Sequence, residues 1–423
     1  MNPAKLSLML VVLVDVMGQG LAFPIFNTLM MQADLGFLPA STSESARRLN
    51  YGLVIGVFFT TWFLGAVYVS RISDSIGRKK GIILCLTGSF TGYLLTIVAM
   101  ASNSLWLLLA SRAITGFTAG TQSIAQAAMA DVSTDDADKG RNMGFIVAGA
   151  GIGLVVGPVI GGVFSDPNLL GSDASLALPF YVGGALNLFA AAMILVFFHD
   201  VNPNRLPLRI NPLDVVRLIL DIGKHPTVCR VTILFFLYMA MLITAYIFLT
   251  NYLSSRFGLD TAGTSVGVLI FGASFGVTST FLVGPFQERM SRKSMIVFSA
   301  VTMIASIALL ISAPNSTLAY LAFIPFGIAH GIGAPALFAL YSSSVDETLQ
   351  GWVMGVSVAM WTLAAGLNSF IGGELLTFGI RNPFLLSMGY GVLLLVAIFI
   401  IGRSDDIRRI SGRVVTGPKS ETE

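Results

Sequence analysis

The chain has 423 residues, of which 55% are hydrophobic and only 11% are Asp, Glu, Lys or Arg. A soluble globular protein carries about 25% charged residues, so this chain has less than half of the charge that a wet surface needs. The mean hydropathy of +0.81 and the formal charge of only +3 exclude a soluble enzyme, a nucleic-acid binder and a disordered chain, and they predict an integral membrane protein.

About 20 apolar residues are needed for a helix to cross the ~30 Å hydrocarbon layer of a membrane. In chain order, this length predicts an all-α fold of twelve transmembrane helices. They cover residues 6–31, 51–71, 81–101, 105–130, 142–164, 178–199, 229–253, 263–286, 294–313, 317–343, 351–375 and 384–402. The first stretch has no small-residue cleavage site, so we expect a retained span rather than a signal peptide.

One connection differs from the short turns between the other spans. Residues 200–228 contain four prolines, several basic residues and a short amphipathic run. We expect a six-helix bundle at 1–199, a cytoplasmic linker at 200–228, a second six-helix bundle at 229–402 and a cytoplasmic tail at 403–423. Of the 25 Lys and Arg residues, 20 fall on the side of both termini and 4 on the other, so the positive-inside rule places both termini in the cytoplasm.

The two halves of the chain repeat each other. A shift of 211 residues aligns Gly116 with Gly327 and Gly120 with Gly331, and it also aligns glycines in the following span. One shift that holds over consecutive elements predicts two parallel copies around a central cavity, which is a transporter architecture.

Residues 70–80, SRISDSIGRKK, resemble the loop between spans 2 and 3 of the major facilitator superfamily, G-x-L-a-D-R-x-G-R-[RK]. The pattern is missed at Ser70 and Ser75, and it is matched at Asp74, Gly77, Arg78 and Lys79. The resemblance implies a gating loop on the cytoplasmic side, which Asp131 and Arg141 join. A basic loop that merely obeys the topology rule is the alternative.

Three spans carry further motifs of the same superfamily. Arg112 and Gly116 resemble its R-x-x-x-G motif, and Asp15 to Pro24 resembles the first span of tetracycline/proton antiporters, D-x-x-G-x-G-x-x-x-P. Span 5 resembles the motif of drug/proton antiporters, g-x-x-x-G-P-x-x-G-G, at Gly149, Gly153, Gly157, Pro158, Gly161 and Gly162. Spacing every four residues also predicts one bare helix face that packs against a neighbour.

The ionisable residues expected in the interiors of the spans are Asp15, Arg112 and Glu374. An apolar medium disfavours the carboxylate of Asp15, whereas a nearby guanidinium would favour it, and a group between these influences can load and release a proton. We therefore expect Asp15 to be the coupling carboxylate and Arg112 its electrostatic partner. A static Asp15–Arg112 pair and snorkelling of Arg112 to the surface are alternatives, and Glu374 is equally well explained as a solvated residue at the rim.

Uncharged polar residues within the spans are candidates for the central cavity. The candidates are Gln19, Gln122, Gln126, Asn187, His330 and Asn368. Each amide needs a hydrogen-bonding partner in an apolar medium. For His330, a neutral imidazole bonded to a backbone carbonyl is the commoner outcome, and a proton relay or ligand contact is the alternative.

Cysteines, histidines and acidic residues show no metal-ligand, disulfide or catalytic spacing, and no P-loop occurs. We therefore expect no enzymatic activity, metal or cofactor, and a proton gradient as the driving force. We predict a monomer in the cytoplasmic (inner) membrane of a bacterium. By the family resemblance, this protein exports a small amphipathic organic compound, tetracycline-like or another drug, by alternating access. Export of one metabolite, such as a siderophore or sugar, is the main alternative, and a non-transporting receptor is a further one.

Overall fold

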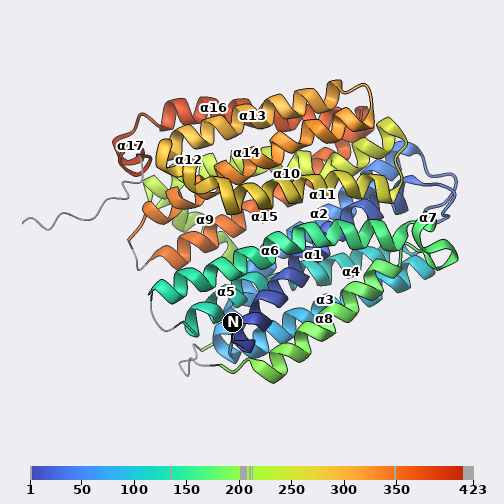
Figure 1. The fold of residues 1–423 in the computed structure, drawn as a ribbon, viewed down its shortest axis with the longest axis horizontal. Coiled ribbons are helices and arrows are strands. Elements are labelled where there is room, and N and C mark those ends of the chain that lie inside the picture. The colour runs from blue at the N-terminus through green and yellow to red at the C-terminus, as the bar shows by residue number, and fades with distance from the viewer. Residues whose placement is uncertain are drawn as a thin grey trace, which may run out of the picture.

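The computed structural model describes residues 2–133, 136–200, 207–208, 211, 213–346 and 349–412. All regular elements in these ranges are helices, which Figure 1 shows as two groups lying side by side. The first group contains α1 (Pro3–Met31), α2 (Glu44–Ile76), α3 (Arg78–Ala101), α4 (Leu105–Phe117), α5 (Thr121–Asp131), α6 (Asp136–Ser165), α7 (Pro167–Leu170), η1 (Gly171–Asp173) and α8 (Leu178–Phe197).

The linker helix α9 (Asp214–Gly223) leads to the second group. This group contains α10 (Pro226–Phe257), α11 (Thr261–Val277), the π-helical turn η2 (Thr278–Leu282), α12 (Val283–Arg289), α13 (Arg292–Ser312), α14 (Ser316–Ser343), α15 (Gln350–Phe378) and α16 (Asn382–Ile401). The tail helix α17 (Asp405–Ile410) follows. Parts of the expected linker and tail, residues 201–206, 209–210, 212 and 413–423, lie outside the described residues.

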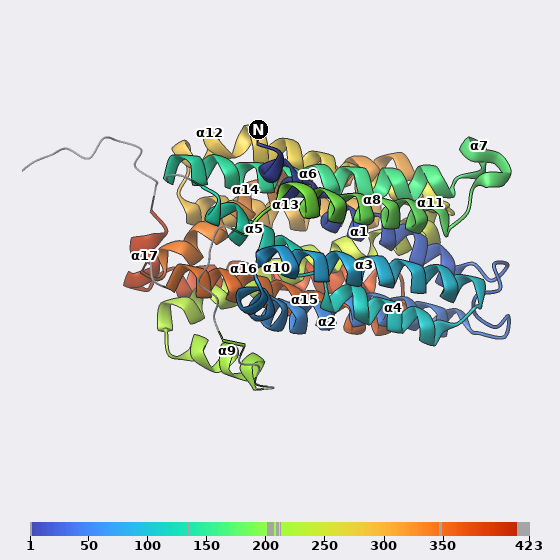
Figure 2. The ribbon, with the colours of Figure 1, turned by 90° about the horizontal axis from the view of Figure 1, so that it is seen from below.

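Eleven helices of the described chain are long and apolar enough to cross a membrane, and the twelfth expected span is divided. It consists of α4 and α5, which are separated at Thr118–Gly120. The membrane-spanning helices run along the long axis of the molecule (Figures 1 and 2). We call the end with residue 2 and α17 the termini end, and the opposite end, with Gln32 and Gly258, the far end.

Bare backbone on α6 allows it to lie directly against α1. A β-carbon on Gly153 would lie 2.4 Å from the carbonyl oxygen of Leu13, and one on Gly157 would lie 2.4 Å from that of Met17. Gly149 and Gly161 continue the same face along the helix. The two helices therefore contact each other along glycines spaced every four residues, as the antiporter-like motif in span 5 predicts.

The two groups are joined at the far end. The side-chain amide of Asn251 donates to Asn27 at 2.9 Å, and the hydroxyls of Thr28 and Thr261 are 2.7 Å apart. The phenol of Tyr51 donates to the carbonyl of Ile247 at 2.6 Å. These bonds join α1 and α2 to α10 and α11 where the helices approach the far end.

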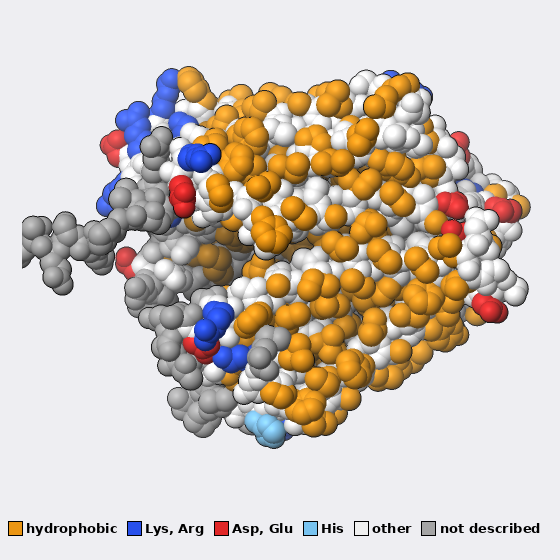
Figure 3. Space-filling model, viewed as in Figure 1, with side chains coloured by type: hydrophobic (Ala, Val, Ile, Leu, Met, Phe, Trp, Pro, Cys, Tyr) orange, Lys and Arg blue, Asp and Glu red, His pale blue; other side chains and the backbone are white. Residues whose placement is uncertain are grey.

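The two groups part toward the termini end. Figure 3 shows a hollow between the two groups at the end of the molecule that carries the tail. Gly144 of α6 and Gly355 of α15, which are repeat equivalents near this end, have no other atom within 4 Å of an added β-carbon. The molecule is therefore closed at the far end and open at the termini end.

The tail helix α17 is attached to α10 by one carboxylate. Asp406 accepts hydrogen bonds from Arg230 at 2.6 Å and Thr227 at 2.8 Å. Burial opposes ionisation of Asp406, but these hydrogen bonds outweigh burial, and the pKa of Asp406 lies below its ordinary value.

Because that pKa is lowered, the attachment is present above the ordinary range of an aspartate and is lost only as the pH falls through the lowered value. We expect Asp406→Asn to speed proteolysis of the tail at pH 7. Changing the pH of the wild-type protein from 8 to 5.5 should not. Faster cleavage of the wild-type tail at pH 5.5 would contradict this account, and limited proteolysis followed by mass spectrometry measures it.

Candidate functional site

The carboxyl group of Asp15 lies halfway along α1 and is incompletely bonded. Its Oδ2 atom is buried and has no hydrogen-bond partner among the described residues. The nearest polar group of the backbone is the N–H of Gln122, in the first turn of α5, which favours the ionised carboxyl. The first N–H groups of a helix have no acceptor within that helix, and they carry partial positive charge. The carboxyl of Asp15 therefore lies at the N-terminus of a helix that begins inside the membrane.

The interruption between α4 and α5 follows from close packing. The helix turns at Thr118 and Gly120, and no side chain from Gly120 caps the new helix. Nearby, a β-carbon on Gly116 would lie 2.2 Å from the carbonyl oxygen of Phe58, and one on Gly65 would lie 2.1 Å from that of Phe117. The backbones of α2 and α4 thus touch beside the interruption, and the freed N–H groups face the acidic residue on α1.

Arg112 is buried in the first group, with 3% of its surface exposed. Its guanidinium carbon lies 4.2 Å from the ring centre of Phe58 and 4.9 Å from that of Phe26. The charge is therefore accommodated by aromatic faces, an interaction of about 0.5–2 kcal/mol for each ring. Snorkelling to the surface is excluded by this burial.

The expected partnership between Asp15 and Arg112 is wrong in this conformation. Phe26, which contacts the guanidinium, follows Asp15 on α1 by eleven residues, a rise of ~16 Å along the helix. No ion pair joins the two charged groups, and Nε of Arg112 has no hydrogen-bond partner among the described residues. A static pair that locks α1 to α4 is excluded for the same reason: the charges lie at different depths.

The amide candidates divide into two sets. Gln19, Gln122 and Gln126 are partly exposed on α1 and α5, as a position at the cavity requires. Asn187 and Asn368 are buried, with 2% and 1% exposed, and each donates to the carbonyl one turn earlier on its own helix. These two asparagines are therefore packed away from the cavity in this conformation, although Oδ1 of Asn368 has no hydrogen-bond partner among the described residues.

His330 is 9% exposed and lies within a network of side chains of the second group. Its Nδ1 atom is 3.3 Å from the hydroxyl of Tyr238. The partner is thus a tyrosine hydroxyl rather than the backbone carbonyl that the sequence favoured. Glu374, by contrast, is exposed near the far end of α15, in agreement with a solvated residue at the rim.

The loop between α2 and α3 forms a charged network at the termini end. Arg78 pairs with Asp74, and its Nε lies 3.4 Å from Asp131 at the end of α5. Lys79 donates to the carbonyl of Leu195, in the last turn of α8, at 2.8 Å. Gly77 has φ 101°, a conformation that strongly favours glycine. The loop therefore fixes the ends of α5 and α8, and the basic side chains complement helix C-termini.

The second group repeats this arrangement without the acidic partner. Arg292, at the start of α13, donates to the hydroxyl of Ser343 at the end of α14 and to the carbonyl of Ile410, both at 2.8 Å. Lys293 lies beside Gly402, after the last turn of α16. The repeat inferred from the sequence is thus also found in the contacts. Arg292 contacts the hydroxyl of Ser343 at the end of α14, whereas Arg78 contacts the carboxylate of Asp131 at the end of α5.

Arg141 does not join the Arg78 network, contrary to expectation. It pairs with Asp138 on the same helix at 2.8 Å, and Lys5 of α1 pairs with the same carboxylate at 2.9 Å. The i,i+3 spacing of Asp138 and Arg141 on one helix predicts this ion pair, whereas the family resemblance implied a network with Asp131. Asp138 ties α1 to α6 at the termini end.

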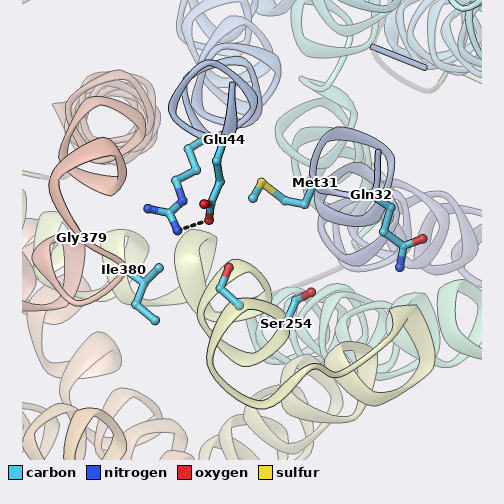
Figure 4. Close-up of a pocket in the computed structure, with 8 residues that line it drawn as sticks. Met31, Gln32, Glu44, Ser254, Gly379 and Ile380 are labelled. Atoms are coloured by element: carbon cyan, nitrogen blue, oxygen red, sulfur yellow. Dashed lines mark hydrogen bonds and ion pairs between the residues drawn. The ribbon is translucent and has the colours of Figure 1, made fainter. Parts of the chain in front are cut away.

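A shallow cavity of about 500 Å³ opens on the far end, outside the contacts that close it (Figure 4). It is lined by Met31, Gln32, Glu44, Arg48, Ser254, Ser255, Gly379 and Ile380. Arg48 pairs with Glu44 and donates to the carbonyl of Leu376 in the other group at 2.7 Å. The floor of this cavity is formed by the contacts that close the far end of the molecule.

Two repeated six-helix groups, joined at one end and parted at the other, define a membrane transporter that works by alternating access. The chain belongs to the Major Facilitator Superfamily, whose sequence model matches residues 8–367 and 231–419.

Individual relatives are distant but match nearly the full length. The chain is 26% identical over 409 residues to the class G tetracycline resistance protein of Vibrio anguillarum, covering 95% of this chain and 98% of the relative. It is 28% identical over 411 residues to the class D tetracycline resistance protein of Salmonella ordonez, with the same coverage. The crystal structure of the human organic anion transporter MFSD10 (TETRAN) superimposes with a TM-score of 0.70 at 18% identity, covering 94% and 99% of the two chains.

Proposed function

We propose that this protein exports small amphipathic organic compounds from the bacterial cytoplasm in exchange for protons, with Asp15 as the coupling residue. The observation that carries the proposal is the buried, unpartnered Oδ2 of Asp15 at mid-membrane, on the helix that forms part of the joint between the two groups. A buried carboxyl oxygen without a partner can bind a proton there. The resemblance to tetracycline resistance proteins supports a drug-like cargo.

In this proposal the termini end faces the cytoplasm and the protein acts as a monomer in the inner membrane. The structure is then the inward-open state. Substrate enters through the hollow seen in Figure 3, and Asp15 exchanges its proton while the far end is closed. Export requires the hydrogen bonds Asn251–Asn27 and Tyr51–Ile247 to break. It also requires the charged loops at Arg78 and Arg292 to approach the opposite group.

Expression in a drug-sensitive bacterium tests the proposal. Cells that produce the protein should accumulate less ethidium or tetracycline than cells with an empty vector, and a protonophore should abolish the difference. Equal accumulation of the whole panel, with the protein folded in the membrane, would overturn drug export and favour export of a dedicated metabolite.

Fixing the far end closed is expected to stop transport. With Cys85 and Cys229 replaced by serine, Asn27→Cys and Asn251→Cys would place two thiols at the contact that is 2.9 Å long in the wild type. Treatment with ethanediyl bismethanethiosulfonate should reduce export to the empty-vector level, and dithiothreitol should restore it. Each single cysteine variant is the control, and unimpaired export by the cross-linked protein would contradict alternating access at this joint.

A further inference from the structure

We propose that His330, Tyr246 and Phe275 recognise a planar aromatic substrate that carries a hydrogen-bond donor. This inference rests on the proposed function and specifies the substrate class. The three residues lie on α14, α10 and α11 of the second group, separate from the coupling carboxylate on α1. Phe271 links them, because its ring centre lies 4.9 Å from that of Tyr246, 6.0 Å from that of His330 and 6.2 Å from that of Phe275.

The rings around His330 are stacked nearly parallel. The imidazole lies 4.8 Å from Phe275 at an interplanar angle of 27°, and Phe271 and Phe275 are inclined by only 8°. Phe271 is 4% exposed, whereas Phe275 is partly exposed. Phe275 therefore offers an accessible aromatic surface, in the orientation that a flat ring needs for stacking.

The hydrogen bonds of His330 determine which ring nitrogen is available. The hydroxyl of Ser299 donates its single proton to the carbonyl of Ala329 at 2.6 Å, or to the sulfur of Met303 at 3.7 Å. In either case the hydroxyl of Tyr238, 2.9 Å away, must donate to Ser299. The oxygen of Tyr238 then accepts from Nδ1 of His330.

A neutral imidazole with its proton on Nδ1 has a lone pair on Nε2. No hydrogen bond from the described residues reaches Nε2. The network therefore presents an acceptor, and no donor, beside the face of Phe275. A substrate N–H or O–H group fits this acceptor.

Tyr246 provides a second polar group without a partner. Its hydroxyl is buried and makes no hydrogen bond to the described residues. Its ring lies edge-on to Phe23 of α1 at 5.3 Å, so the phenol is at the joint between the two groups. An unpaired hydroxyl is unfavourable in an apolar medium, and a hydrogen bond to a polar substituent of the substrate would remove this penalty. Alongside these groups, α11 continues into the π-helical turn η2, a distortion that is frequent at functional sites.

Acridone and N-methylacridone are suitable probes, because both are planar and only acridone has an N–H donor. Binding to the full-length protein in lipid nanodiscs can be followed by quenching of tryptophan fluorescence. Trp62 and Trp361, whose ring centres are 4.7 Å apart, lie in an aromatic cluster that reaches Phe23 through Phe59. We expect the wild-type protein to bind acridone about 3- to 10-fold more tightly than the methylated compound, as one neutral hydrogen bond provides.

His330→Phe should reduce this ratio to about one while keeping an aromatic ring in the stack. Phe275→Leu should weaken both compounds by a similar factor. His225→Phe is the matched control, because the ring of His225 packs against Trp352 at the termini end, 5.2 Å away and tilted by 52°. This variant should keep the wild-type ratio. Tyr238→Phe, which removes the acceptor for Nδ1 and leaves His330 in place, should lower the ratio and decides the question if His330→Phe does not fold.

A wild-type ratio of about one, an unchanged ratio in folded His330→Phe, or no binding of either compound would overturn the inference. The assay needs no proton gradient, so its outcome is separate from that of export. If the affinity ratio of acridone to N-methylacridone depends on His330 but the protein shows no proton-driven export, the binding site is supported and the proposed function is rejected. Export without the ratio would do the reverse.

Discussion

Replacing Asp15 by asparagine is expected to abolish proton-driven export and to preserve substrate binding. Asparagine keeps the size of the side chain, and its carbonyl oxygen can face the backbone N–H of Gln122 as the carboxylate does. It has no oxygen that can take up a proton at Oδ2, the atom that is buried and unpartnered in the wild type. Transport driven by a pH gradient should therefore fall to the level of liposomes without protein.

Binding in nanodiscs should remain within about twofold of the wild type, because asparagine keeps the size of the side chain and the residues that we propose to recognise the substrate lie in the second group. Glu374→Gln is the matched control: it makes the same chemical change on an exposed carboxyl and should transport at the wild-type rate. Full gradient-driven export by Asp15→Asn would rule out Asp15 as the coupling residue.

Adding one methyl group to α6 at Gly153 is expected to destabilise the first group severely. The new β-carbon would lie 2.4 Å from the carbonyl oxygen of Leu13 and 3.0 Å from the backbone nitrogen of Met17, so the backbones of α1 and α6 must separate. Overpacking of this kind costs about 1–3 kcal/mol or more, which exceeds the ~0.5–1 kcal/mol that alanine gains over glycine in a helix. Gly153→Ala should therefore lower the melting temperature by several degrees and reduce transport.

The control for this change is two residues away on the same helix. Gly151→Ala places its methyl group where no other atom lies within 4 Å, so only the gain in helix propensity remains. That variant should melt at or slightly above the wild-type temperature. Equal melting temperatures for Gly153→Ala and Gly151→Ala, measured by thermal shift in the same detergent, would contradict the packing account.

The fold was predictable because lipid imposes a length on each apolar segment and a repeat imposes a symmetry. The interruption after Phe117 was not predictable from hydropathy, since Thr118 and Gly120 are tolerated in continuous membrane helices. It depends on the approach of α2 to α4 at Gly65 and Gly116, a tertiary contact. The sequence therefore predicts one span where the structure has two helices. The N-terminus of the second of these helices, α5, lies beside Asp15 of α1.

The site was predictable in residue type but not in pairing. Sequence alone identifies Asp15 and Arg112 as charges inside the membrane, and it places them on spans 1 and 4, which run in opposite directions. Which depth each charge occupies relative to the other depends on how α1 and α4 slide along each other, and Phe26 and Phe58 occupy the position next to the guanidinium. The position of Nδ1 of His330 beside Tyr238 likewise depends on the contact between α10 and α14.

The repeat also explains why the two halves have different roles. Arg78 closes its network on Asp74 and Asp131, whereas the equivalent Arg292 closes on Ser343 and a carbonyl. The first half thus has acidic residues in its loop network and within α1, whereas the second half has an imidazole that is stacked among aromatic rings. In our account the first half handles the proton and the second half handles the substrate.

Proton movement across liposomes tests the central claim most directly. Purified protein is reconstituted with a pH-sensitive dye inside, a pH gradient is imposed, and tetracycline-like and other amphipathic compounds are added. The account predicts compound-dependent proton release from the acidic side by the wild type, none by Asp15→Asn, and wild-type release by Glu374→Gln. Compound transport by folded wild-type protein without any proton movement, or equal proton release by Asp15→Asn, would contradict it.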